Sequence, residues 1–415
     1  MHKRRHLGKR FIKSIKGEIM GNEDYLIKNV SLFDTSNGDI SVSDLAIKNG
    51  RVTSPDLLKD PKIKDGTGLI TMFGIWDCHS HPGSLMYDNF AHGYFESAAA
   101  RTIRAGSNLI EAARLGITGV RALSEANQID IEWGKTFKDG GYKGPRVLSA
   151  GAGIRVTGGH GTAYPRKSMD LHWELAADGP AEMSKLARTL IEEGVNWLKL
   201  MLTGGLFSEF ETVEDNQFTT EELSAVMEVA NNKNIPVAAH CGGARTAEKF
   251  AVLGGKSIEH GYALDEKSAK VMAENGTWLV PTISVTQDTE MHETDQWPKH
   301  AMERAKIAGK KHVEALQACV AAGVKIATGA DYNPIGPRML RELELLEKAG
   351  MSRLQVIHAA TSAGKELNGY GVESKPEVGS IADLIFMRKN PIEDISNFRE
   401  IEAVMSFGRF IIEPN

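Results

Sequence analysis

Short apolar runs alternate with amphipathic segments through the middle of this 415-residue chain. The runs have the length of buried strands, and most segments between them carry apolar residues at the three- and four-residue spacing of surface helices. The runs occupy residues 75–78, 118–123, 146–150, 197–202, 236–240, 257–260, 278–283 and 325–328, and the clearest helical segments are 98–115, 180–193, 220–232, 301–322 and 339–349. Eight strands with intervening helices predict an α/β fold, a (β/α)8 TIM-like barrel whose functional site lies at the carboxyl ends of the strands.

Both ends of the chain differ from its middle, because they carry strand-like runs only. These runs are residues 25–30 and 44–48 near one end, and 379–387, 403–407 and 409–412 near the other. We therefore expect a small β-sandwich domain formed by both termini, from residues 22–70 and 373–415, beside a barrel of residues 71–372. Residues 1–21 are rich in Lys and Arg and lack the apolar core of a signal peptide, which predicts a disordered basic tail.

Composition narrows the class of partner. A net charge of −5 gives no reason to expect a nucleic-acid partner, and no apolar stretch reaches the roughly 18 to 20 residues of a membrane helix. Three cysteines are too few for a disulfide framework and fit a reducing compartment. We expect a cytoplasmic protein that acts on a small-molecule substrate.

A His-x-His pair, His79 and His81, follows the first run of the predicted barrel. Alternate residues of a strand share a face, so both imidazoles can chelate one divalent cation. Such a pair in isolation is more often two surface histidines near a turn. However, His240, His260 and Asp331 also follow or end apolar runs, and the strand ends of a barrel meet at one rim.

Lys199 interrupts an otherwise nearly apolar run. A buried ammonium group is costly unless it is paired or deprotonated, and a deprotonated lysine can add carbon dioxide to form a carbamate. The carbamate is an anionic oxygen ligand that can bridge two cations. The run alone leaves open a lysine that extends to solvent from the strand end. The histidines and the aspartate at the same rim favour the carbamate.

These donors predict two divalent metal ions. Imidazole and carboxylate groups suit Zn²⁺ above all, with Mn²⁺ or Co²⁺ as alternatives. His79, His81 and Asp331 are expected to hold one ion and His240 and His260 the other, with carboxylated Lys199 between them. Two such ions lower the pKa of a bridging water and polarise a carbonyl, and Asp331 can then carry the proton to the leaving amine.

Substrate contacts are expected from the loops at the same rim. His160 lies in the glycine-rich segment 157–161, where it can orient the substrate or polarise its carbonyl; an exposed histidine on a flexible loop is the alternative. Gly205 belongs to a second glycine-rich segment, which follows Lys199. Arg338 is a candidate for binding a substrate carboxylate, although its position also fits the start of a helix.

With these motifs the chain resembles the amidohydrolase superfamily, in its prolidase-like and imidazolonepropionase-like branch that includes Xaa-Pro and Xaa-Arg dipeptidases. The motifs are residues 77–81, 199–205, 239–240, 257–261 and 328–331, with 360–363 and 379–384 towards the end of the chain. The segment from Lys199 to Gly205 is similar to that of binuclear members with a carboxylated lysine. The resemblance implies a barrel flanked by the terminal β-domain, Asp331 as proton shuttle and His160 as a substrate contact. Family members are often oligomeric, so a homo-oligomer is an open expectation.

The residues and the resemblance together predict a metal-dependent hydrolase of the amide bond in a dipeptide or an N-acyl amino acid, and they favour a prolidase-like dipeptidase. Dipeptide-cleaving members often carry an aromatic residue or a histidine two residues after the strand-five ligand, where this sequence has Gly242. Hydrolysis of a cyclic amide, a lactone or an organophosphate ester is the alternative on the same site. A metal-binding protein without catalytic activity is a third, remote reading.

Overall fold

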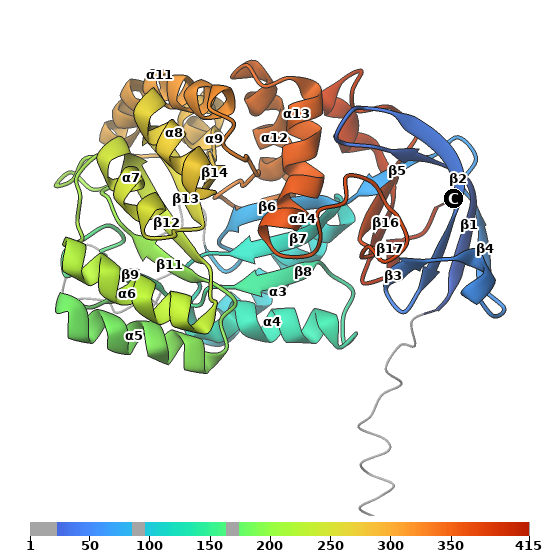
Figure 1. The fold of residues 1–415 in the computed structure, drawn as a ribbon, viewed down its shortest axis with the longest axis horizontal. Helices are drawn as coiled ribbons and strands as arrows, with labels where there is room; N and C mark the ends of the chain where they lie inside the picture. Colours follow the sequence, from blue (N-terminus) through green and yellow to red (C-terminus); the bar gives the residue numbers. More distant parts are fainter. Residues whose placement is uncertain (1–22, 85–95, 163–173, 415) are drawn as a thin grey trace, which may run out of the picture.

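The computed structural model describes residues 23–84, 96–162 and 174–414, so the predicted basic tail lies outside the described residues. A helix-covered barrel stands beside a sheet that both ends of the chain form (Figure 1). Across the described residues, no helix combines the length and the apolar character that crossing a membrane requires.

The barrel strands pair in parallel throughout. One group of three has the order β6-β7-β8 and one of six has the order β10-β9-β11-β12-β13-β14. Their bounds are β6 (Ile75–Ser80), β7 (Ile117–Ala122), β8 (Arg146–Ser149), β9 (Gly153–Arg155), β10 (Glu174–Ala176), β11 (Leu198–Met201), β12 (Val237–Gly243), β13 (Ser257–Ala263) and β14 (Trp278–Val280). Seven of the eight predicted runs are therefore strands, and β9 and β10 are additions.

The eighth predicted run, residues 325–328, closes the barrel without forming a named strand. Ile326 makes an isolated bridge to Leu279 of β14, and the amide of Cys78 on β6 donates to the Thr328 carbonyl at 2.8 Å. On the other side, the Trp197 amide donates to the Ser149 carbonyl at 3.1 Å and joins the two groups of strands. The pairing is short because the chain turns away at Asp331, whose backbone has a left-handed φ of 67°.

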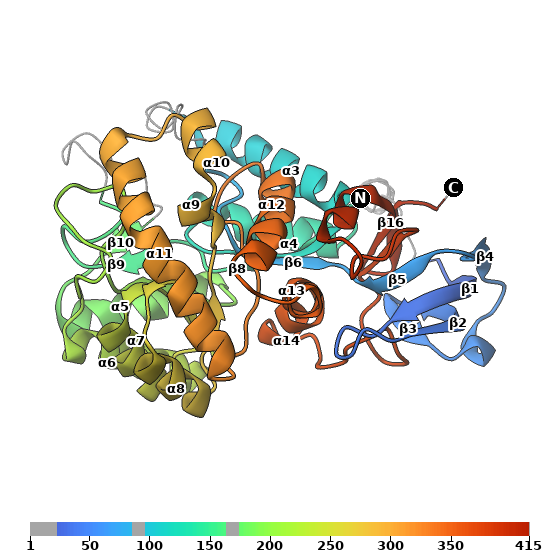
Figure 2. The same ribbon diagram turned by 90° about the horizontal axis from the view of Figure 1, so that it is seen from above.

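Helices cover the outside of the barrel, and α11 runs along one side of it (Figure 2). The α-helices are α3 (Ala98–Arg114), α4 (Ile129–Lys138), α5 (Gly179–Glu193), α6 (Thr220–Lys233), α7 (Ala244–Val252), α8 (Glu266–Asn275), α9 (Ser284–Gln287), α10 (Thr289–Thr294), α11 (Lys299–Ala321), α12 (Ile335–Lys348), α13 (Arg353–His358) and α14 (Gly364–Leu367). A π-helical turn, Ala359–Ala363, lies between α13 and α14, and short 3-10 turns occupy Pro55–Leu57, Ala126–Gln128 and Ile395–Glu400. All five predicted helical segments are helices. Thr219 and Glu222 cap α6 reciprocally, as a hydroxyl residue before an acidic first turn predicts.

The strands of both termini form one eight-stranded sheet, in which β4 pairs with β1 beside the path β17-β16-β15-β5-β1-β2-β3. The bounds are β1 (Tyr25–Phe33), β2 (Ile40–Lys48), β3 (Arg51–Thr53), β4 (Lys62–Asp65), β5 (Ile70–Phe73), β15 (Leu384–Met387), β16 (Ile401–Ser406) and β17 (Arg409–Ile412). In a flat sheet, β1 and β17 would stand roughly 19 Å apart. Their side chains Tyr25 and Phe410 nevertheless meet edge to face at 5.0 Å, so the sheet folds over its own core in the manner of a sandwich.

The amino ends of the barrel strands carry an apolar layer and an ion pair to the terminal sheet. An apolar layer with three buried tryptophans, Trp76, Trp197 and Trp278, fills the barrel near the amino ends of the strands. Arg146, the first residue of β8, forms an ion pair with buried Asp383 of the terminal sheet, which also accepts from the Phe407 amide at 2.6 Å. The predicted ligands lie towards the opposite, carboxyl end of the strands.

Candidate metal centre

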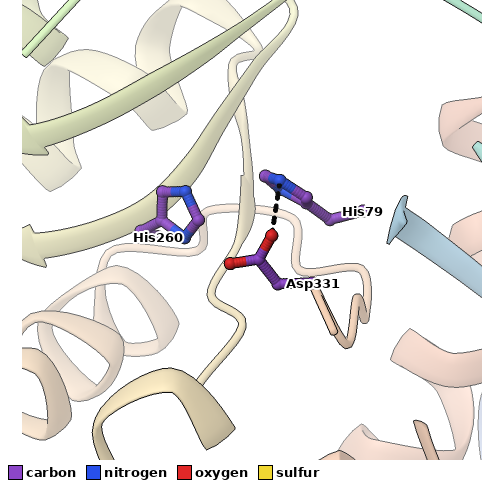
Figure 3. Close-up of side chains that lie close together, drawn as sticks. All are labelled: His79, His260 and Asp331. Atoms are coloured by element: carbon purple, nitrogen blue, oxygen red, sulfur yellow. Dashed lines mark ion pairs between the residues drawn. The ribbon is translucent and has the colours of Figure 1, made fainter. Parts of the chain in front are cut away.

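Three of the predicted ligands converge most closely at the carboxyl rim. His79 lies on β6, His260 on β13, and Asp331 follows the bridge that closes the barrel. Each offers one ligand atom, and these atoms all lie within 4.8 Å of one another. Figure 3 shows the imidazole of His79 facing the Asp331 carboxylate, with Nε2 and Oδ1 3.3 Å apart. This spacing leaves room for a cation between them.

The other three predicted ligands lie around this group. His81 Nε2 is 3.1 Å from Asp331 Oδ1, and the ring of His240 lies 4.5 Å from that of His260. Lys199 lies inside β11 and is only 1% exposed. In the pairing of β11 with β12, Lys199 is opposite Ala238, two positions before His240 and so on the same face of the sheet, and its charge lowers the pKa of His240. The structure thus brings together all six residues that the strand-end pattern selected.

The electrostatics suit cation binding. Burial lowers the pKa of His79, His240 and His260 well below the usual value, so their imidazoles are neutral and keep a lone pair for a metal. Burial opposes the charge of Asp331 as well, but His79 and His81 lower its pKa to about 2. Burial would also lower the pKa of His81, yet the hydrogen bond that its Nε2 donates to the Asp331 carboxylate raises the pKa overall.

A buried glutamate fixes the orientation of His79. Glu259, on β13, accepts from His79 Nδ1 at 2.9 Å and from the Arg121 guanidinium at 2.8 Å. Glu259 and Arg121 are both fully buried, and Ser257 donates to the same carboxylate at 2.5 Å. Because Nδ1 of His79 is engaged, its proton stays there and Nε2 faces the centre as an unprotonated donor.

His260 and Asp331 are held in a backbone conformation that side chains rarely adopt. Their φ angles are 69° and 67°, and Thr282, which contacts His260, has a φ of 46°. The Thr282 hydroxyl lies 2.7 Å from His260 Nδ1, and the His260 carbonyl accepts from His312 Nε2 at 2.9 Å. Left-handed non-glycine residues cluster at functional sites, where the surrounding contacts hold them.

His160 and Gly205, two of the predicted substrate contacts, touch each other. The His160 ring stacks on His240 with centroids 4.0 Å apart, and a Cβ on Gly205 would lie 2.2 Å from His160 Cε1. Glycine is therefore required at this position by the approach of the ring. Nδ1 of His160 lies 2.7 Å from the Glu211 carboxylate.

Arg338, the third predicted contact, lies on α12, and its guanidinium pairs with Asp295 at 2.6 Å. Its use for a substrate carboxylate stays a prediction.

The structure explains why a glycine stands at position 242. A Cβ there would stand 2.3 Å from the Val213 carbonyl, so the loop that follows β11 occupies the place of a larger residue.

Sequence reasoning missed three residues that support the centre. Arg121 and Glu259 are charged residues inside strand-like runs, the same signal that singled out Lys199. Glu211 lies in a loop of mixed polar residues, where nothing in the pattern indicates burial, yet its side chain is only 8% exposed.

The donor set fits a divalent metal of the zinc type. It consists of three neutral imidazoles, those of His79, His240 and His260, with the His81 imidazole and one ionised carboxylate, and a carboxylated lysine would add a second anionic oxygen ligand. His79, His81, Asp331, His240, His260 and Lys199 are the residues that could hold such ions.

Comparisons with known proteins show which sequences this chain resembles. The Amidohydrolase family model matches residues 70–411. An ochratoxinase of Aspergillus niger is 31% identical over 358 residues, which cover 81% of this chain and 73% of that protein. An imidazolonepropionase of Psychrobacter cryohalolentis is 25% identical over 381 residues, 80% of either chain.

Solved structures of two hydrolases are similar to this chain. A Xaa-Pro dipeptidase with methionine bound in its active site is 27% identical and has a TM-score of 0.81, covering 94% of this chain and 99% of the other. The A. niger ochratoxinase structure is 27% identical with a TM-score of 0.82, covering 95% and 96%.

Proposed function

Because the chain belongs to the amidohydrolase family, we propose that it is a metal-dependent hydrolase of the amide bond in a dipeptide or an N-acyl amino acid. The observation that carries this proposal is the grouping of His79, His260 and Asp331 within reach of one ion, with His81, His240 and buried Lys199 beside them. The names of two similar proteins, an ochratoxinase and a Xaa-Pro dipeptidase, support a substrate built on an amino-acid amide.

The proposed centre holds two divalent ions, with Zn²⁺ as the first choice. His79, His81 and Asp331 would bind one, His240 and His260 the other, and Lys199 would join them after carboxylation of Nζ. Bound divalent ions supply a Lewis acid for the substrate carbonyl and lower the pKa of a water molecule.

The chain's own residues supply the proton transfer and the orientation. Asp331 is ionised at neutral pH, so its carboxylate can accept a proton from the attacking water and return it to the leaving nitrogen. His160, stacked on His240, lies where a side chain can donate to the substrate carbonyl or carboxylate.

An aromatic cluster beside the centre favours a substrate with an apolar group. The rings of Phe207 and Trp297 are 4.5 Å apart, and those of Trp297 and Tyr332 are 5.4 Å apart. Tyr332 directly follows Asp331, and Phe207 lies two residues after Gly205. The cluster thus joins the two sides of the proposed site, and we expect faster cleavage of amides that carry an aromatic or large aliphatic group.

The test is hydrolysis by the metal-reconstituted protein of paired substrates with a free or an amidated C-terminus. The panel contains dipeptides and N-acyl amino acids, with cyclic amides, lactones and an organophosphate ester for comparison. We expect cleavage of the amide substrates and its loss in Lys199→Ala and Asp331→Asn. Turnover confined to free carboxylates identifies a dipeptidase or N-acyl amino-acid hydrolase, whereas turnover of the esters alone would contradict the proposal.

Carboxylation of Lys199 has its own readout. Wild-type protein incubated with ¹³C-labelled bicarbonate should show a carbamate carbon resonance that Lys199→Ala lacks. Full activity in Lys199→Ala, or no resonance in a fully metallated wild-type sample, would exclude the bridging role.

A further inference from the structure

The Glu211 carboxylate collects three hydrogen bonds at the edge of the proposed site. Its Oε1 accepts from the Gly205 amide at 3.0 Å and from His160 Nδ1 at 2.7 Å, and its Oε2 accepts from Gln217 Nε2 at 3.0 Å. The side chain is 8% exposed, so these partners take the place of water.

Gln217 completes a closed network around His160. Its Oε1 accepts from the backbone amide of His160 at 2.8 Å, while its amide group donates to Glu211. One member of the pair therefore fixes the ring of His160 and the other fixes its backbone. Because Nδ1 is engaged by Glu211, Nε2 is the ring nitrogen that His160 can present to a substrate.

The loop that carries Glu211 is also held by contacts that do not involve its carboxylate. The Arg304 guanidinium donates to the Glu211 backbone carbonyl at 2.9 Å, and the side chains of Thr212 and Asp215 bond at 2.7 Å. The loop is thus fixed by its backbone and by neighbouring side chains, and a change confined to the Glu211 carboxyl group should leave the fold intact.

We propose that Glu211 and Gln217 are positioning residues, which together hold His160 in the one orientation that lets Nε2 contact the substrate. This inference rests on the proposed amide-hydrolase function. On this proposal, the loop after β11 contacts the loop after β9 in order to orient a residue that binds the substrate, and not only to pack against it.

The direction of the hydrogen bonds makes the proposal testable. In Glu211→Gln, the new amide group that replaces Oε2 faces the Gln217 amide group, so two donors oppose each other. In Gln217→Glu, two carboxylates oppose each other instead. In the double variant Glu211→Gln/Gln217→Glu, each donor again faces an acceptor, and His160 keeps both of its partners.

The experiment compares kcat, KM, metal content and thermal unfolding for the wild type, both single variants and the double variant. We expect kcat to fall about 10- to 100-fold in either single variant, the range typical for loss of a partner that orients an active-site group. In the double variant it should return to within a few-fold of the wild type. Metal content should stay near the wild-type value throughout, and the unfolding temperature should fall slightly in the single variants and recover in the double variant. Glu209→Gln, an exposed change on the same loop, is the matched control and should behave as wild type.

The outcomes separate this inference from the function on which it rests. No amide turnover by the wild type refutes the proposed function. Turnover by the wild type with an unaffected Glu211→Gln variant, or a double variant no better than the single ones, refutes the positioning role. The proton resonance of His160 Nδ1 gives a readout without turnover: it should be present in the wild type and the double variant and altered in Glu211→Gln.

Discussion

Replacing Glu259 with glutamine should separate what the buried charge network contributes to stability from what it contributes to metal binding. Oε1 of Glu259 accepts from Arg121 and Ser257, and Oε2 accepts from His79 Nδ1. In Glu259→Gln, the carbonyl oxygen can keep the first two partners. The new amide group then points a donor at His79 Nδ1, which forces the imidazole proton onto Nε2 and blocks the nitrogen that faces the proposed metal site.

Two magnitudes follow from this geometry. Arg121 and Glu259 are both 0% exposed, so removing the carboxylate leaves a buried guanidinium without its counter-charge, at a cost of about 3–5 kcal/mol. Loss of the correct His79 tautomer should weaken metal binding by about 10- to 100-fold. In Arg121→Met/Glu259→Gln the unpaired charge is gone, so part of the stability should return while metal affinity stays low.

The assays are urea unfolding of the metal-free proteins, which removes the stabilisation that bound metal would add, and metal titration of the folded proteins. Glu314→Gln is the control, because this glutamate is 61% exposed and lies 3.8 Å from Lys310, a pair worth about 1 kcal/mol or less. Wild-type metal affinity in Glu259→Gln would refute the tautomer reasoning. Equal stability of the single and double variants would refute the account of the buried charge.

Three further predictions concern single contacts. The pKa of Asp331 is about 2 against an ordinary 3.8, so its ionised carboxylate stabilises the metal-free fold above pH 3.8 and loses this effect as the pH falls towards 2. The difference in unfolding free energy between wild type and Asp331→Asn should therefore shrink by about 2 kcal/mol over that range. A constant difference in acid unfolding curves would contradict this. Asp383→Asn removes the partner of Arg146 between barrel and sheet, and should cost about 3 kcal/mol in urea unfolding while kcat per folded molecule is unchanged. Gly242→Ala places a Cβ 2.3 Å from the Val213 carbonyl, so the backbone must shift; we expect a loss of about 1–3 kcal/mol and a lower kcat, and a variant with normal kcat would show that this loop tolerates displacement.

The fold followed from the sequence because its strands and helices differ in period and length. The apolar runs ending near His79, Lys199, His240 and His260 are continuous, as strands buried on both faces require. The run at 325–328 is less apolar, since it begins with exposed Lys325, and it makes only a bridge. The apolar residues of a run determine whether it is buried. The number of its residues that hydrogen-bond to a neighbouring strand depends instead on where the chain turns to bring Asp331 to the rim.

The proposed metal ligands could be predicted from the sequence for a related reason. Each of them lies on or just after a barrel strand or, for Asp331, after the bridge that closes the barrel, and the fold alone places those positions on one rim. The loop residues could not be predicted in this way. Glu211 and Gln217 contact His160 from a segment whose sequence shows no helical or strand-like hydrophobic pattern. Their burial depends on how the loop after β11 folds back across the barrel mouth.

Charged residues inside predicted barrel strands form one class, although the sequence reading used only one of them. Lys199, Arg121 and Glu259 all interrupt runs that are otherwise largely apolar, and all three are buried in the structure. The sequence identifies such a position but cannot say whether the charge is neutralised by a partner or by chemistry. Arg121 and Glu259 neutralise each other at 2.8 Å. Because a guanidinium stays protonated and a lysine amine does not have to, Lys199 is the member of this class that can become a carbamate. The variant Lys199→Arg should therefore keep the positive charge, fold, and fail to bind the second metal ion, an outcome that metal analysis of the purified protein would check.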